Sequence, residues 1–416
     1  MKKIAFVTLG CKLNYAETST WERAFVKAGF EAVPWREKAD VYLVNTCSVT
    51  EVSNKKSRSE IRKLHRINPD AAIVVTGCYA ELKRDEVLGI EGVSLVFGAG
   101  QKSALVPETL RFLSGQEQPF KAAPESIFPA YSSGERTRAF LKVQDGCDNF
   151  CAYCTVPFAR GRSRSVRSCE AVRMAEEIAS MGMKEIVLTG VNTGDFGRDT
   201  GESFLGLLQD LNRVDGIERY RISSIEPNLL SEEIIDWIAS GTKFQPHFHI
   251  PLQSGSDEIL SRMGRRYDTA FFASKIEYIR RKMEGPGKPK VFFGIDIMTG
   301  LPGETEDLFL QSRSFIEKLH PAFLHIFPYS IRPGTRAASM PDQVDAAVKA
   351  ARVASLEELC TALHSEFVAA HKGTRAEVLF ESTEKDGMMS GYTGNYIRVS
   401  RPWDPGMVGK IAEVEI

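Results

Sequence analysis

Short apolar runs recur along the first hundred positions of the chain, and each is followed by a longer stretch with a different period. The runs are rich in β-branched residues and three to five residues long, as is typical of buried strands. They occupy residues 4–7, 41–44, 71–75 and 95–97. Between them apolar residues return every three or four positions. We therefore expect one helix over 16–29, a second that follows the strand at 41–44 and ends near Arg66, and a third over 80–88. This alternation predicts an open parallel α/β sheet.

The alternation weakens over residues 101–136, where prolines stand among Ser, Gly and Gln, and it resumes with longer units from Thr137. Six further strands are expected, with helices such as 169–181 and 306–319 between them. The strands are predicted at 139–143, 185–188, 220–225, 248–252, 291–298 and 323–327. Six parallel strands with outer helices indicate a partial (β/α)6 barrel of the TIM type, with its chemistry at the carboxyl ends of the strands.

A helical pattern over 342–372 ends at Gly373, and short strand patterns follow it. We expect these strands at 376–380, 396–399 and 409–414, with turns at Gly391, Gly394 and Gly406, which together predict a small β-barrel. The fold class is therefore α/β with a β-rich end. The expected domains are residues 1–115, a linker at 116–136, residues 137–372 and residues 373–416.

Composition narrows the class of protein. The 416 residues are 43% hydrophobic and 26% charged, with a formal net charge of -1. No apolar run approaches the roughly 20 residues of a membrane-spanning helix, and the start MKKIAFVTLG indicates a strand, not a signal peptide. Eight cysteines without a secretion signal indicate a reducing compartment and metal or redox chemistry. We expect a cytoplasmic protein without membrane contact; the sequence does not predict its oligomeric state.

Three cysteines lie within eight residues, at Cys147, Cys151 and Cys154, directly after the first barrel strand. A structural zinc site has four closed ligands, and no fourth ligand is near, because Cys169 lies beyond a basic stretch. Three thiolates on a four-iron cluster leave one iron open for a small ligand. The alternative is that these three are buried free cysteines without a metal. Cys360, on the apolar side of its predicted helix, is interpreted as such a core cysteine.

The other three cysteines share a different feature. Cys11, Cys47 and Cys78 each follow a predicted strand of the first domain, in the contexts TLGC, VNTC and VTGC. Ligands gather at the carboxyl ends of strands in an open α/β sheet. We therefore expect these thiols at one edge and a second cluster held by them, although buried cysteines at strand ends are the plainer alternative.

At this point the motifs resemble a known family. CDNFCAYC is similar to the cluster loop of the radical S-adenosylmethionine (SAM) superfamily, and residues 144–164 are similar to its methylthiotransferase family. TLGCKLNYAET, NTCSVT and TGCYAE resemble that family's N-terminal domain, and the β-rich end resembles its TRAM domain. The resemblance implies two 4Fe-4S clusters, SAM and an electron donor such as flavodoxin or ferredoxin. It implies no side-chain nucleophile, because the cofactors perform the C–H chemistry.

The resemblance also implies where SAM binds. Small and polar residues follow several barrel strands, and any one of them alone would be read as a turn. The expected SAM residues are Tyr153, Gly190, Asn192, Ser224, Glu226, Gln253, Thr299 and Gly300.

The motifs TLGCK, QDGC, LTGVNTG and HIFPYS…RPGTRA are most similar to the branch that thiomethylates threonylcarbamoyladenosine beside the tRNA anticodon. The resemblance therefore implies tRNA as the partner, and clustered arginines can hold its phosphates or a carboxylate. The candidate substrate and RNA contacts are Arg160, Arg162, Arg164, Arg332, Arg336 and Arg398. We expect Arg332 or Arg336 to contact the threonylcarbamoyl carboxylate.

Three alternatives stay open. Isopentenyladenosine in tRNA and an aspartate of a ribosomal protein are the other substrates of the resembled family. The acidic β-rich end, with five Lys or Arg against seven Asp or Glu from Gly373 onward, keeps the ribosomal-protein alternative open. A non-enzymatic iron–sulfur RNA-binding protein or redox sensor is the alternative from a different class.

Overall fold

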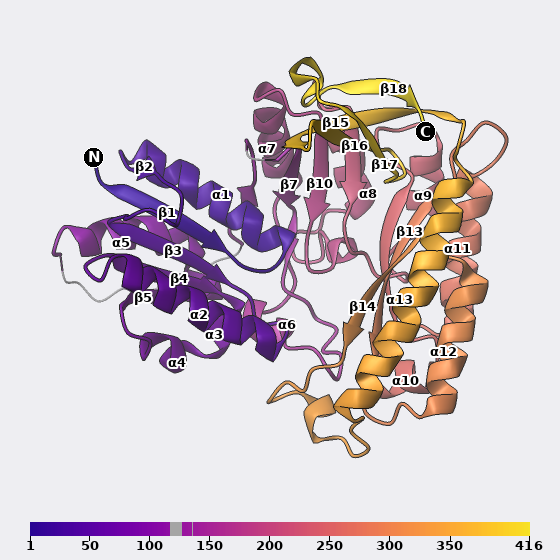
Figure 1. Cartoon of the computed structure of the whole chain (residues 1–416), viewed down its shortest axis with the longest axis horizontal. Coiled ribbons are helices and arrows are strands. Elements are labelled where there is room, and N and C mark those ends of the chain that lie inside the picture. The colour runs from indigo at the N-terminus through magenta and orange to yellow at the C-terminus, as the bar shows by residue number, and fades with distance from the viewer. Residues whose placement is uncertain (117–126, 135) are drawn as a thin grey trace.

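The computed structural model describes residues 1–116, 127–134 and 136–416. Its N-terminal part is a five-stranded parallel sheet in the order β2-β1-β3-β4-β5 (Figure 1). The strands are β1 (Lys3–Thr8), β2 (Glu31–Ala32), β3 (Val41–Thr46), β4 (Ala72–Gly77) and β5 (Val93–Phe97). β3 and β4 are buried along their whole length, as expected for parallel strands covered on both faces.

Helices cover both faces of this sheet. The aromatic side chains of α1 (Lys12–Lys27) pack with α5 (Leu105–Leu113) against one face. On the other face α2 (Glu51–Ile67), α3 (Cys78–Leu82) and α4 (Arg84–Leu88) bury their apolar residues. The single helix predicted over 80–88 was wrong, because Lys83 interrupts the helical backbone and separates α3 from α4.

The stretch predicted to weaken after residue 101 is more regular than its prolines indicate. A 3-10 helix η1 (Ala99–Ala104) leads directly into α5, and Pro107 lies in the first turn of α5. Proline is tolerated there because the first N–H groups of a helix lack intrahelical partners. The predicted linker at 116–136 falls largely on residues 117–126 and 135, which lie outside the described residues.

The central part is an open barrel of six parallel strands, as predicted. They are β7 (Arg138–Lys142), β10 (Glu185–Thr189), β11 (Arg219–Ile222), β12 (His247–Gln253), β13 (Phe292–Thr299) and β14 (Phe323–Pro328). A bridge between Tyr220 and Phe244 joins the two halves, and the short β6 (Ala130–Tyr131) pairs antiparallel with β7. The largest core cluster fills the space between the strands and their helices.

The outer helices surround the barrel, with α13 running along its outer side in Figure 1. They are α7 (Ser168–Ser180), α8 (Phe204–Asn212), α9 (Glu232–Ala239), α10 (Asp257–Arg262), α11 (Thr269–Met283), α12 (Glu306–Leu319) and α13 (Ala346–Ala369). Short elements at the rim are β8 (Gln144–Asp145), α6 (Val156–Arg160), β9 (Arg164–Ser165), η2 (Thr193–Asp195) and η3 (Arg336–Ser339). Cys360 is buried in α13, as predicted for a core residue.

The C-terminal part is an antiparallel half-barrel in the order β17-β16-β15-β18, with η4 (Pro405–Met407) before its last strand. Its strands are β15 (Arg375–Lys385), β16 (Met388–Thr393), β17 (Arg398–Pro402) and β18 (Ile411–Glu415). The turn predicted at Gly391 was wrong: this residue lies inside β16, where a Cβ atom would stand 2.5 Å from a methyl group of Val378. Arg219 and Arg221 of the barrel donate hydrogen bonds to carbonyls of this sheet, which fixes it against the barrel.

None of the described helices combines the length and the apolar character needed to cross a membrane.

Candidate functional site

Cys11, Cys47 and Cys78 follow β1, β3 and β4, three adjacent parallel strands, so the sheet brings them to one edge. The amide of Leu9 donates to the carbonyl of Asn45, and Thr46 pairs with Gly77, which sets the three chain ends side by side. Gly10 has φ +107°, and a Cβ atom there would lie 2.8 Å from the Cβ of Cys47. The close approach of the loop after β1 to the loop after β3 therefore requires glycine at position 10.

This edge suits a cation that binds thiolates. Burial raises the pKa of the Cys47 and Cys78 thiols, and the neighbouring thiols of the set raise it further. The Arg160 guanidinium beside them acts in the opposite direction and hydrogen-bonds Cys78. A bound metal ion would deprotonate these thiols outright. All eight cysteines of the chain are free, so the three at this edge are available as ligands.

The loop of Cys147, Cys151 and Cys154 begins just after β8, and N–H groups point at its sulfur atoms. The Asn149 amide lies 3.5 Å from the sulfur of Cys147, and the Val156 amide lies 3.4 Å from that of Cys154. Burial raises the pKa of Cys147 to about 11 and that of Cys154 to about 12. Three partly exposed thiols with N–H donors at their sulfurs fit an iron–sulfur cluster, whose properties depend on such hydrogen bonds.

Arg265 was missed by the sequence analysis. Its guanidinium donates to the sulfur of Cys151 at 3.1 Å, and another nitrogen forms a 2.6 Å ion pair with Glu226. It also donates to the hydroxyls of Tyr153 and Tyr267. One buried cation thus connects the cluster loop with a predicted SAM residue.

The predicted SAM residues lie at the carboxyl ends of the barrel strands. Gly190 and Asn192 follow β10, Ser224 and Glu226 follow β11, Gln253 and Thr299 end β12 and β13, and Gly300 follows β13. Gln253 has φ +70°, a conformation that non-glycine residues rarely adopt and that gathers at functional sites. The Gly300 amide donates to a carboxylate oxygen of Glu304 at 2.6 Å, which fixes the turn after β13.

The two cysteine-bearing regions meet through a buried ionic cluster. Helix α6, just after Cys154, packs against α3, which begins at Cys78 (Figure 1). Beside this contact, three cations and two carboxylates from four separate chain segments pair with one another. They are Glu17, Lys102, Lys142, Asp145 and Arg160. Their formal charges leave one net positive charge beside the thiols of Cys11 and Cys78.

The charged side chains of this ionic cluster form short ion pairs with one another. Lys102 and Lys142 each lie 2.7 Å from a Glu17 oxygen, and Arg160 lies 2.9 Å from Asp145. Burial alone would raise the pKa of Glu17, but the three cations outweigh it and lower that pKa to about 2. Arg160 is only 3% exposed and also donates to Asn14, so its guanidinium is engaged inside the protein; that it contacts substrate or RNA stays a prediction.

The other predicted arginines have different surroundings. Arg162 is exposed beside Asp148, and Arg164 donates to the carbonyl of Arg160. Arg332 is 6% exposed and donates to the hydroxyl of Ser48, next to Cys47. Arg336 is exposed in η3. The last of the set, Arg398, is exposed and borders the cavity described next.

A cavity of about 970 Å³ lies between the three parts of the molecule. Cys11 and Lys12 line it from the N-terminal sheet, His249 and His325 from the barrel, and Tyr396 from the C-terminal part. Its volume is at the upper end of the range for small-molecule sites. Lys12 is exposed to the solvent of this cavity. Burial by the surrounding protein and the positive charges of Arg138 and Arg221 lower the pKa of its ammonium group.

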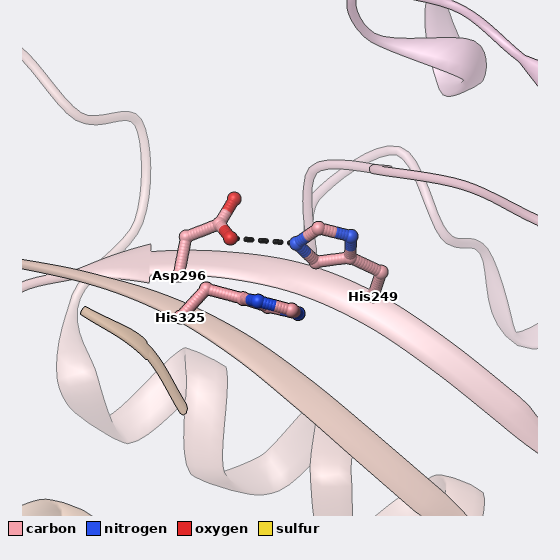
Figure 2. Close-up of side chains that lie close together, drawn as sticks. All are labelled: His249, Asp296 and His325. Carbon is pink, nitrogen blue, oxygen red and sulfur yellow. Dashed lines mark hydrogen bonds and ion pairs between the residues drawn. The ribbon is translucent and has the colours of Figure 1, made fainter. Parts of the chain in front are cut away.

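Three polar side chains from neighbouring strands converge in the barrel (Figure 2). His249 hydrogen-bonds Asp296 at 2.6 Å, and the rings of His249 and His325 lie 4.7 Å apart. The potential ligand atoms of the three residues lie within 4.8 Å of one another, a spacing that one metal ion can bridge. Burial and the charge of His249 lower the pKa of His325 to about 4, so this ring is neutral at pH 7.

Comparisons with known proteins agree with this geometry. A family model described as "Uncharacterized protein family UPF0004" matches residues 3–98, and the Radical SAM superfamily model matches residues 141–316. The structure of the radical SAM methyltransferase TsrM from Kitasatospora setae has a TM-score of 0.61 at 14% identity, covering 81% of this chain and 75% of that one. The fold and the cluster loop therefore define a radical SAM enzyme, which uses SAM and a 4Fe-4S cluster.

Curated relatives give the narrower family. The threonylcarbamoyladenosine tRNA methylthiotransferase MtaB of Bacillus subtilis is 40% identical, over 100% of this chain and 94% of its own length. The tRNA-2-methylthio-N(6)-dimethylallyladenosine synthase of Carboxydothermus hydrogenoformans is 31% identical, over 100% and 96%. This chain belongs to the radical SAM methylthiotransferase family. It is a transferase, so the non-enzymatic alternative is set aside.

Proposed function

We propose that the protein converts N6-threonylcarbamoyladenosine next to the tRNA anticodon to its 2-methylthio derivative. The observation that carries the proposal is the cavity that Cys11 lines between the N-terminal edge and the barrel. The identity of 40% with the Bacillus subtilis enzyme exceeds the 31–34% found with four dimethylallyladenosine synthases, which favours the threonylcarbamoyl substrate.

Cys147, Cys151 and Cys154 would hold the cluster whose open iron binds SAM, and this group supplies the radical that activates the C–H bond. The chain's own residues hold the site in order. Arg265 orients the Cys151 sulfur and Glu226 together, and Tyr153 lies within 3.4 Å of Arg265. Gly190 leaves room beside Gln144, whose side chain accepts hydrogen bonds from the amides of the loop after β10.

Cys11, Cys47 and Cys78 would hold a second 4Fe-4S cluster, at which sulfur is held before transfer. Two features support this part of the proposal: the convergence of three free thiols at one sheet edge, and the net positive charge of the ionic cluster beside them. A cluster with three thiolate ligands is anionic, so buried positive charge stabilises it.

Helix α2 offers an exposed basic face for the tRNA backbone. Lys55, Lys56, Arg62 and Arg66 are exposed, whereas Arg58 is held by Glu51 and Glu86. An electron donor such as flavodoxin or ferredoxin and a cytoplasmic location are parts of the same proposal.

The test uses protein purified and reconstituted without oxygen, supplied with SAM, sulfide and a reductant. The substrates are anticodon stem-loops that differ only in carrying threonylcarbamoyladenosine or isopentenyladenosine, together with the ribosomal protein. Mass spectrometry of digested products should find the methylthio group on threonylcarbamoyladenosine. Product on either of the other substrates, with none on threonylcarbamoyladenosine, would overturn the proposal.

A further inference from the structure

Lys12 is the first residue of α1 and lines the central cavity directly after Cys11. Within the described ranges, 1–116, 127–134 and 136–416, no hydrogen bond or ion pair engages its ammonium group. Lys12 is exposed to the solvent of the cavity, and no carboxylate of the described residues pairs with its charge, so an anion that enters the cavity meets an uncompensated ammonium group. The position therefore favours the arrival of an anion.

The other charges around Lys12 are already engaged. Arg138 pairs with Glu381 at 2.6 Å and donates to the Tyr396 hydroxyl. Arg221 pairs with Glu185 at 2.7 Å and donates to two carbonyls of the C-terminal sheet.

The carboxylate whose charge reaches Lys12 is that of Asp296, and one of its oxygens takes part in the short hydrogen bond with His249. Of the three cations Lys12, Arg138 and Arg221, Lys12 is therefore the one left for a ligand.

Two other cations line the cavity: Arg136 lies over the rings of Tyr15 and Phe140, and Arg398 donates to the Ser390 hydroxyl.

We propose that Lys12 binds the carboxylate of the threonylcarbamoyl group and thereby selects this substrate over adenosines with an apolar N6 substituent. This inference rests on the proposed function and names the residue that would set its specificity. A lysine ammonium offers three donors on a flexible stem, which suits a carboxylate at the end of a flexible substituent.

The place of Lys12 fits the chemistry of the base. In adenine the N6 substituent and C2, the carbon that receives the methylthio group, both flank N1, so they lie on the same edge of the ring. The residue that reads the substituent should therefore lie near the group that delivers sulfur. Lys12 directly follows Cys11, and adjacent Cα atoms are about 3.8 Å apart.

The arginines that we first expected in this role are placed differently. Arg332 donates at 2.8 Å to Ser48, on the loop that follows Cys47, and lies 3.7 Å from Glu51, the first residue of α2. Neither Arg332 nor Arg336 lines the central cavity, whereas Lys12 does. Lys12 thus replaces them as the predicted carboxylate contact.

The experiment compares two anticodon stem-loops: one with threonylcarbamoyladenosine as the free acid and one with its methyl ester, which is larger by one methyl group and carries no charge. Methylthiolation is measured as kcat/KM for each stem-loop, and binding is measured separately by fluorescence anisotropy. The wild-type enzyme should prefer the acid by about tenfold to hundredfold, as expected for one charge-assisted contact.

Lys12→Met should remove this preference, and Lys12→Arg should restore part of it. Iron content and 5′-deoxyadenosine formation from SAM without RNA should stay at wild-type values, which distinguishes a specificity role from loss of fold. Lys27→Met is the matched control, because Lys27 is an exposed lysine at the other end of α1.

Each adverse outcome has a separate meaning. If Lys12→Met keeps the preference for the acid, Lys12 does not read the carboxylate. The same conclusion follows if the preference is abolished instead by Arg136→Gln, which changes another cation that lines the cavity. If the wild-type enzyme accepts acid and ester equally, no residue reads it and the inference fails. If the wild-type enzyme modifies neither form but modifies isopentenyladenosine, the proposed function itself is wrong.

Discussion

A guanidinium nitrogen of Arg265 lies 3.1 Å from the sulfur of Cys151. The same guanidinium is paired with Glu226, so the hydrogen bond to the sulfur is held by a charged neighbour and does not depend on a mobile side chain. Positive charge and N–H donors at cluster sulfurs stabilise the reduced, more negative cluster.

Arg265→Met should therefore lower the reduction potential of the barrel cluster. Loss of about 1.4 kcal/mol of stabilisation corresponds to roughly 60 mV for a one-electron couple, and SAM cleavage should slow by about tenfold or more. A redox titration followed by electron paramagnetic resonance measures the potential. Arg266→Met is the control, because Arg266 is the exposed neighbour. An unchanged potential in Arg265→Met would show that this hydrogen bond does not tune the cluster.

The two sets of cysteines should hold iron independently. Replacing Cys147, Cys151 and Cys154 by Ala should remove about half of the iron and all SAM cleavage. Iron analysis and an assay for 5′-deoxyadenosine check both results.

Replacing Cys11, Cys47 and Cys78 by Ala should also remove about half of the iron but spare SAM cleavage and abolish the methylthio product. Replacing Cys169 and Cys360 is the matched control, since one is exposed and the other lies in the α13 core. Methylthio product from the variant without the N-terminal cysteines would contradict the second cluster.

Glu17 should make stability depend on pH. Its pKa of about 2 in the folded protein lies below the usual 4.5, so the stabilisation is complete above pH 4.5 and is lost as the pH falls toward 2. The shift corresponds to about 3 kcal/mol. Glu17→Gln should destabilise the protein by about 3–5 kcal/mol at pH 7, because it leaves buried lysines without a full counter-charge.

Urea unfolding followed by circular dichroism at several pH values measures this effect. Glu31→Gln, which changes an exposed carboxylate of β2, should leave both the stability and its pH profile close to wild type. A Glu17→Gln variant with the wild-type slope between pH 4.5 and 2 would refute the role of the ionic cluster.

The exposed basic face of α2 should contribute to tRNA affinity. Replacing Lys55, Lys56, Arg62 and Arg66 by Gln should weaken binding and reduce its salt dependence. The slope of log K against log salt concentration should fall by about 0.7–0.9 for each phosphate that the variant no longer neutralises. Filter binding at several salt concentrations measures both effects.

The control for this variant replaces four exposed cations of the barrel that lie far from α2 in the chain. They are Arg281, Lys288, Lys290 and Lys318. Equal effects of the two sets would indicate only a change in net charge.

The sequence predicted those parts of the molecule that follow from local patterns. Strand periodicity and the carboxyl-end rule were enough to bring Cys11, Cys47 and Cys78 to one edge, because parallel strands fix where their ends lie. The break between α3 and α4 at Lys83 and the strand through Gly391 escaped prediction. At Gly391 the close approach to Val378 outweighs local propensity, whereas Lys83 breaks the helix with an extended φ of -138°.

The polar interior could not be predicted in this way. Arg160 stands in an arginine-rich run that is typical of an anion-binding surface, yet its partners Glu17 and Asp145 lie 143 and 15 residues away in the chain. Arg265 and Lys12 likewise acquire their surroundings from distant segments. A cysteine spacing is a local signal, whereas the partner of a buried charge is decided by packing.

The cavity has walls from all three parts of the protein, and this constrains the RNA that enters it. An adenosine stacked between its neighbours cannot present C2 and its N6 substituent to the interior of a protein. The nucleotide must be flipped out of the anticodon loop, at a cost of a few kcal/mol that is smallest where the base is already unpaired. A loop position beside the anticodon meets that condition. The enzyme would therefore recognise that the nucleotide is unpaired and easily flipped, as well as the chemistry of its base.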